Sequence, residues 1–149
     1  MKGHENFMKS VFAPSKGWAA GALVASGTLT FSSSKDELLP TFVAKLDAEK
    51  RGVLIAAASG LGLKNKVYLH KPRNKNSRPE AILTIRDLDQ LKNKILLILH
   101  FGLFGGKHTV LQNWLDRIEN DQKVPARYKI LPKLYKSGFY SKNIFTKIE

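Results

Sequence analysis

The sequence predicts an α+β domain with one four-stranded antiparallel sheet that helices cover on one face. Two observations indicate this class. Four short segments alternate polar and apolar residues, and segments of helical periodicity lie before, between and after the two strand pairs. The chain has 149 residues, of which 43% are hydrophobic, so it is long enough for one domain with its own core. The expected order is helix, two strands, helix, two strands and two closing helices.

The first helix is expected from Lys16 to Ser26, with Ser15 as its N-cap. Along it, Gly17, Gly21 and Ala25 recur every four residues and therefore share one face. A glycine inside a helix costs about 1 kcal/mol relative to alanine, so two of them need a structural reason. Close approach of a second helix is the usual reason, and this face is predicted to be a helix-packing interface.

Four segments with the two-residue period of half-buried strands follow. They are residues 28–33, 39–47, 64–70 and 81–86. An alanine-rich helix is expected at about 50–61, between the two strand pairs. Two further helices are expected, from Asp87 as N-cap to about Phe101 and from His108 to Asn120. The remainder, 121–149, contains two prolines and many lysines and is expected to wrap the domain with one short helix.

In such a sheet one face is apolar and packs against the helices. That face comprises Leu29, Phe31, Phe42, Leu46, Val67, Leu69, Leu83 and Ile85. The opposite face comprises Thr28, Thr30, Ser32, Thr41, Lys45, Lys64, Lys66, Tyr68, His70, Thr84 and Arg86, and its one expected carboxylate is Asp47. The turn at 71–79 adds Lys71, Arg73, Lys75 and Arg78. Amines and hydroxyls of this kind bind phosphates and base edges, so this face and turn are predicted to bind nucleic acid.

The overall charge favours the same kind of partner. Lys and Arg total 25 against 12 Asp and Glu, which gives a net charge of +13 that attracts polyanions. The absence of cysteine excludes disulfides, a cysteine zinc site and a thiol nucleophile. No apolar stretch reaches the roughly 18 residues of a membrane helix. His70, His100 and His108 lack metal-ligand spacing, and no metal or cofactor is expected.

The segment from Trp18 to Leu29 resembles the signature that names the LAGLIDADG homing-endonuclease family, with Gly21 and Gly27 at its two glycine positions. The later strands and the helix that leads through a glycine turn to Lys107 are similar to the family's next elements, and Trp114 matches a common aromatic position. The resemblance covers 15–120. It leaves 1–14 as an N-terminal extension and 121–149 as a basic C-terminal tail.

The resemblance implies an αββαββα unit whose curved sheet sits on a nucleic-acid groove. It also implies that signature helices pack together between two such units. Only one signature is present, so the expected arrangement is a homodimer, or a lone unit whose helix packs on another protein or RNA. Lys107 matches the family's basic active-site position and is expected to contact a phosphate.

The family's nucleases carry acids near the end of the signature helix, and these bind the catalytic metal ion. Ser26 and Val24 occupy those positions, and neither side chain is a suitable ligand for a hard cation such as Mg²⁺. The sequence therefore leads to the expectation that the chain is not an enzyme, with nuclease activity lost.

The expected role is binding of RNA as a structural scaffold. A component of an organellar ribosome is preferred, in the mitochondrion or else a plastid, with ribosomal RNA and neighbouring ribosomal proteins as partners. The location follows from the family's usual habitat. The alternatives are a DNA homing endonuclease that acts as a homodimer, an intron-splicing cofactor (a maturase) and a DNA-binding regulator of its own gene.

Overall fold

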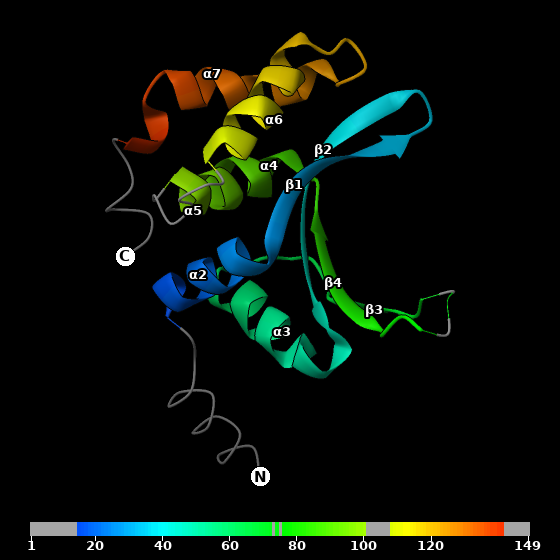
Figure 1. Cartoon of the computed structure of the whole chain (residues 1–149). Coiled ribbons are helices and arrows are strands. Elements are labelled where there is room, and N and C mark those ends of the chain that lie inside the picture. The colour runs from blue at the N-terminus through cyan, green and yellow to red at the C-terminus, as the bar shows by residue number, and fades with distance from the viewer. Residues whose placement is uncertain (1–14, 73, 75, 101–107, 142–149) are drawn as a thin grey trace.

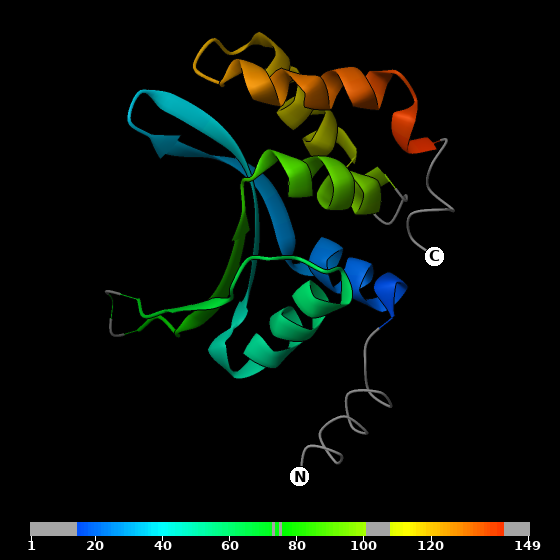
Figure 2. The ribbon, with the colours of Figure 1, turned by 180° about the vertical axis from the view of Figure 1, so that it is seen from behind.

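The computed structural model describes residues 15–72, 74, 76–100 and 108–141. Its centre is a four-stranded antiparallel sheet with strand order β1-β2-β4-β3. The two views in Figures 1 and 2 show all the helices on one side of this sheet, while the other side is bare. The predicted α+β class with a curved antiparallel sheet is therefore confirmed. No helix in the described ranges is long and apolar enough to span a membrane.

The order of elements follows the sequence prediction closely. The elements are α2 (Lys16–Ser26), β1 (Gly27–Ser34), β2 (Glu37–Asp47), η1 (Ala48–Lys50), α3 (Arg51–Gly60), β3 (Tyr68–His70), β4 (Glu80–Ile85), α4 (Leu88–Gln90), η2 (Leu91–Ile95), α5 (Leu96–His100), α6 (His108–Asn120), η4 (Ala126–Lys129) and α7 (Ile130–Lys136). Elements α4, η2 and α5 follow one another directly, and η2 is a π-helical turn.

Helix α2 begins where the sequence places it, because the Ser15 hydroxyl accepts a hydrogen bond of 3.0 Å from the Trp18 N–H. The helix then passes into β1 with no loop between them. Gly27, at this junction, has no room for a side chain. A Cβ there would overlap the ring of Phe42 and lie 2.6 Å from the Leu23 carbonyl oxygen. The contact holds the end of α2 directly against the middle of β2.

The hydrophobic core lies between the inner face of the sheet and the helices. Its fully buried side chains come from every layer, among them Leu23 of α2, Leu54 of α3, Leu83 of β4 and Ile95 of the π-helical turn. Burial of a side chain of this size contributes about 1.5–3 kcal/mol, so these contacts dominate the stability of the fold.

The third strand is shorter than expected. The sequence predicts a strand over 64–70, but β3 comprises only Tyr68–His70, and Lys64 and Lys66 lie in an irregular segment before it. This segment is held by the Gln90 side chain on α4 in place of a strand ladder. Leu69 takes the inward register opposite Ala81, yet 51% of it stays exposed because β3 is the edge strand.

The C-terminal segment contains the short helix expected there, which is α7. It packs against α6, and two tyrosine hydroxyls attach it to the rest of the domain. Tyr128 donates to the Arg86 carbonyl at 2.6 Å, and Tyr140 donates to the Lys92 carbonyl at 2.8 Å. The described part of this segment is therefore integrated into the same body as the sheet.

The substitution Gly27→Ala is expected to lower the free energy of unfolding by about 1–3 kcal/mol, because either the Phe42 ring or the α2 backbone must move. Urea denaturation followed by circular dichroism measures the change. Gly21→Ala on the same helix is the control. A Cβ at Gly21 meets nothing within 4 Å, so this substitution should stabilise the helix. Equal effects at the two positions would contradict the close contact at Gly27.

Candidate nucleic-acid interface

The face of the sheet that points away from the helices carries rows of side chains set by the strand register. Beginning near the β1–β2 hairpin, the rows are Thr30–Thr41, then Thr28–Val43–Thr84, then Lys45–Ile82–Tyr68, and finally Asp47–Glu80–His70. The first rows offer mainly hydroxyls, although Thr41, which was expected on this face, is fully buried. The third offers an ammonium and an aromatic ring, and the last offers two carboxylates beside an imidazole.

This outer face is more mixed than the sequence predicted. The expectation that Asp47 is its only carboxylate is wrong, because the register places Glu80 directly opposite Asp47. Val43 and Ile82 add apolar side chains at the centre of the face. The face therefore offers hydroxyl, apolar and aromatic contacts suited to bases and sugars. Its cations suited to phosphates lie mainly around the rim.

Among the predicted contacts on the face, Lys45 and Tyr68 are the most clearly placed. Both are exposed, and Tyr68 is 67% exposed. They flank Ile82, which pairs with Lys45 on one side and with Tyr68 on the other. An ammonium group and an aromatic ring that share one row can bind a phosphate and stack on a base of the same strand.

Lys64 and Lys66 are exposed, and the sequence gives no sign of how they are held in place. The Lys64 N–H donates to the buried Gln90 Oε1 at 2.7 Å, and the Gln90 amide donates to the side chains of Asp87 and Asn65. The Asn65 amide donates in turn to the Thr84 carbonyl at 2.8 Å. This buried network holds the two lysines beside β4 without an ion pair.

The remaining predicted contacts lie at the edges. Lys71, His70 and Arg78 are exposed where the β3–β4 turn begins and ends. Within this turn Asn74 accepts from the backbone of Asn76 and Ser77. Arg73, Lys75 and Lys107 lie outside the described residues, as does the glycine turn before Lys107.

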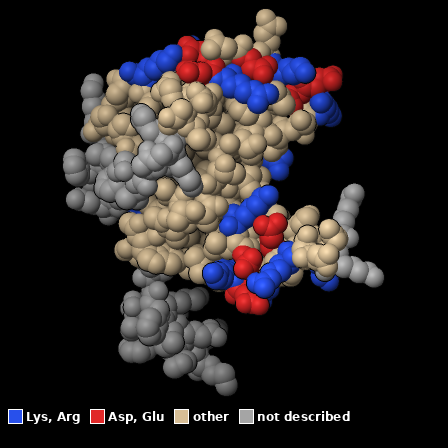
Figure 3. All heavy atoms as spheres, viewed as in Figure 1, with Lys and Arg blue, Asp and Glu red and all other residues tan. Residues whose placement is uncertain are grey.

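Charge is unevenly spread over the molecule. Figure 3 shows basic and acidic side chains close together over α6 and α7 and around the β3–β4 hairpin, and few charges over α2. The helix face predicted to pack on a partner lies in this weakly charged region. Gly17 and Gly21 have nothing within 4 Å of an added Cβ, and Trp18 beside them is 46% exposed. The role of Gly17, Gly21 and Ala25 as a helix-packing interface stays a prediction.

The two positions that correspond to the family's acids lie at the end of α2. Val24 is buried, and the Ser26 hydroxyl donates to the Ala22 carbonyl at 2.8 Å. Neither side chain supplies a carboxylate for a metal ion. Within the described ranges, no group of three or more His, Cys, Asp or Glu side chains is placed to hold one.

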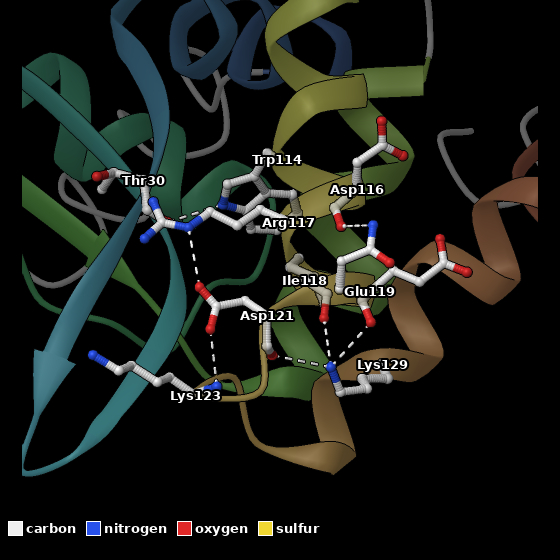
Figure 4. A network of polar contacts seen from close by, with 10 residues as sticks. Thr30, Trp114, Asp116, Arg117, Ile118, Glu119, Asp121, Lys123 and Lys129 are labelled. Carbon is white, nitrogen blue, oxygen red and sulfur yellow. Dashed lines mark hydrogen bonds and ion pairs between the residues drawn. The ribbon is translucent and has the colours of Figure 1, made fainter.

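The C-terminal segment is attached to the β1–β2 hairpin by a network that the sequence did not suggest (Figure 4). The Trp114 indole donates to the Thr30 carbonyl at 2.9 Å, and the Arg117 guanidinium lies 4.6 Å from the centre of the Phe31 ring. Lys129 donates to three carbonyl groups where α6 ends. These contacts join strand β1, helix α6 and the segment after it into one unit.

Asp121 closes the turn after α6. The Lys123 N–H donates to its carboxylate at 2.9 Å, and Arg117 approaches the other oxygen at 3.4 Å. The backbone hydrogen bond from Lys123, aided by Arg117, holds the pKa of Asp121 below its ordinary value. Elsewhere, the hydrogen bond from Lys136 to Glu119 raises the pKa of Lys136, and burial raises the pKa values of Tyr135 and Tyr140.

This fold is that of the LAGLIDADG homing endonucleases. The group I intron-encoded homing endonuclease I-CeuI, complexed with DNA, matches with a TM-score of 0.51 and 19% identity over 85% of this chain and 57% of that one. The LAGLIDADG homing endonuclease I-LtrWI, bound to target DNA, matches with a TM-score of 0.52 and 16% identity over 83% and 44%. A mutant of I-SmaMI matches with a TM-score of 0.53 and 18% identity over 84% of this chain and 44% of that one.

The chain thus spans about half the length of these proteins. No profile of a known protein family matches it, and no curated protein matches it in sequence. The predicted resemblance in fold is confirmed. The expectation that the chain is not an enzyme is wrong: the structures that it matches are homing endonucleases, which are enzymes. That expectation relied on Val24 and Ser26 alone.

Three residues shape the interface in a way that the sequence did not predict: Gln90, Trp114 as an anchor of β1, and Tyr128. Each acts through a hydrogen bond to a residue at least 25 positions away in the sequence. The shortest of these separations is that between Gln90 and Asn65. No local signal singles out Gln90, because polar residues surround it in the sequence that follows Asp87.

The substitution Gln90→Met is expected to lower the free energy of unfolding by about 1–3 kcal/mol, because the Lys64 N–H and the Asn65 side chain lose their buried partner. Gln112→Met is the matched control. The Gln112 amide makes a single part-buried bond of 3.1 Å to Asp116, so the loss there should stay below that at Gln90, which has several partners. Chemical denaturation of both variants measures the difference, and equal losses would contradict the Gln90 network.

Acid should weaken the turn after α6. The folded-state pKa of Asp121 lies below the ordinary value of 3.8, so its carboxylate stabilises the fold fully above that pH and loses this effect as the pH falls through the folded pKa. Asp121→Asn is therefore expected to be less stable than the parent at pH 7 and to lose less stability than the parent below pH 4. Denaturation curves across that range measure it, and parallel curves would contradict it.

Proposed function

We propose that this chain binds duplex DNA across the outer face of its sheet, as a domain with the homing-endonuclease fold. The observation that supports this best is the sorting of side chains by the strand register. It leaves one face of the sheet free of helices and lines it with hydroxyls, Lys45 and Tyr68.

The chemistry of the face fits a duplex. Hydroxyls and apolar groups can contact base edges and thymine methyl groups in a groove, and the cations around the rim can contact phosphates. The net charge of +13 adds a long-range attraction to any nucleic acid. Two of the structures with the same fold, I-CeuI and I-LtrWI, were solved with DNA bound.

A second candidate ligand is RNA, which the sequence analysis preferred. The observation that favours it is Tyr68, whose ring is 67% exposed on an edge strand and free to stack on an unpaired base. On this view the chain would be a scaffold for an organellar RNA. DNA is the leading proposal because the stacking group is a single ring, whereas a broad face of hydroxyl and apolar groups suits a groove.

The open face of α2 suggests how two copies would share one DNA site. Gly17 and Gly21 leave room for a second helix, and the region around them carries little charge. A homodimer joined there would place two sheets side by side, and it would prefer a site with twofold symmetry. Selection of bound sequences from a random duplex pool tests this, because a lone unit would select a site without symmetry.

The affinity for duplex DNA is expected to fall with salt, and Lys45→Gln with Lys66→Gln should reduce the slope of log affinity against log salt. Each lost phosphate contact on B-form DNA lowers the slope by about 0.9, so the pair should lower it by about 1.8. The matched control is Lys16→Gln with Lys133→Gln, which removes the same charge from α2 and α7. The control should shift the slope far less.

The measurement is fluorescence anisotropy with the selected duplex at several salt concentrations. Equal shifts for the two double variants would show that net charge alone drives binding and would contradict an interface on the sheet. The same assay with single-stranded and duplex RNA compares the two candidate ligands. Tighter binding to RNA than to any selected DNA would replace the proposal with the RNA scaffold.

A further inference from the structure

Strand β2 extends past the end of β4, and this leaves one of its edges without a strand partner. The last pair between β2 and β4 is Phe42 with Ile85, while β2 continues to Glu37 paired with β1 alone. The Leu38 N–H on the open edge donates to the Lys123 carbonyl at 3.0 Å. The segment 121–129 therefore contacts the edge of β2 beyond the end of β4.

This segment is firmly held on both sides. At its start, Asp121 accepts from the Lys123 N–H at 2.9 Å. At its end, the Tyr128 hydroxyl donates to the carbonyl of Arg86, the residue that follows β4, at 2.6 Å. Lys129 binds the last carbonyls of α6. The segment is thus attached to β2 at Lys123 and to the residue after β4 at Tyr128.

The nearby half of the outer face lacks cations of its own. Strand β1 carries no charged residue, and between Glu37 and Val43 the only charge on β2 is that of Glu37 itself. The rows there present the hydroxyls of Thr28, Thr30 and Ser32, while Thr41 is fully buried and its hydroxyl bonds to that of Ser32 at 2.8 Å. A nucleic acid that crosses the whole face would find base contacts in this half, but the one cation there is the exposed Lys35 in the β1–β2 turn.

The segment beside it carries such cations. Lys123 and Arg127 are exposed, and in the described part of the chain neither comes within ion-pair distance of a carboxylate. The Arg127 guanidinium stacks 4.9 Å from the centre of the Tyr128 ring, whose hydroxyl is bound to Arg86. Figure 4 shows the Lys123 side chain extending from the turn toward the β1–β2 hairpin.

We propose that the segment 121–129 is a second phosphate-binding edge of the interface, in which Lys123 and Arg127 contact the DNA backbone over the hydroxyl-lined half of the sheet. This inference rests on the proposed binding of DNA by the outer face. It assigns to the C-terminal segment, which lies outside the signature-bearing unit, a direct part in binding. Arg86, fixed by Tyr128, forms the junction between this edge and the sheet.

The test compares Lys123→Gln with Arg127→Gln against the control pair Lys16→Gln with Lys133→Gln, in the full chain. Each pair removes two positive charges, and all four side chains are exposed, so loss of folding is not expected. The first pair should lower the slope of log affinity against log salt by about 1.8, and the control pair should lower it far less. Unfolding curves of both variants check that the domain is intact.

Ethylation interference locates the contacts on the DNA. Some phosphates should block binding of the parent when they are ethylated but not binding of the Lys123→Gln, Arg127→Gln variant. These phosphates should cluster at the border of the site, apart from those whose interference disappears in the Lys45→Gln, Lys66→Gln variant. If the Lys123→Gln, Arg127→Gln variant leaves both the salt slope and the interference pattern unchanged, the proposal of a second phosphate-binding edge is wrong. If the Lys45, Lys66 pair still lowers the slope in that case, binding by the sheet survives. If the parent binds no duplex DNA, the proposed function fails first.

Discussion

The close contact at Gly27 determines how the helices and the sheet are joined. Because a side chain there would overlap the Phe42 ring, α2 can pass straight into β1 and stay against the middle of β2. This junction sets the direction of α2, so that Leu23 is buried and Gly17 and Gly21 face outward. The other helices lie on the same side of the sheet as α2, and the opposite side is bare. A surface suited to a helix is thus separated from a surface suited to nucleic acid.

The bare side of the sheet separates two kinds of contact. Its centre presents hydroxyl, apolar and aromatic groups that can read or stack on bases, and its rim presents most of the cations that can hold phosphates. Phosphate contacts set the orientation of a protein on nucleic acid, whereas base contacts set its preference for a sequence. On this molecule, changes at the rim should act on affinity and salt dependence, and changes at the centre should act on which sequence is bound.

Positions at the rim are held by buried hydrogen bonds more than by ion pairs. The described residues include only two ion pairs, and both lie at the surface near α6, where such pairs contribute little. The Gln90 side chain holds the segment with Lys64 and Lys66 by accepting from the Lys64 N–H. The Tyr128 hydroxyl holds the backbone of Arg86 by donating to its carbonyl. Most lysines and arginines of the described ranges therefore form no ion pair, and the net charge of +13 attracts a polyanion.

Local patterning was sufficient for the fold class and for helices α2 and α6, whose bounds agree with the prediction, because caps and periodicity act within a few residues. The sorting of most strand residues between the two faces also followed from alternation. The third strand was overestimated and Glu80 was overlooked, because a side chain on α4 and the pairing of β2 with β4 decide those features. The closure of the β2 edge by 121–129 depends on contacts between residues about 40 to 85 positions apart, such as Leu38 with Lys123. No local pattern records such a contact, since its free energy comes from packing that exists only in the folded chain.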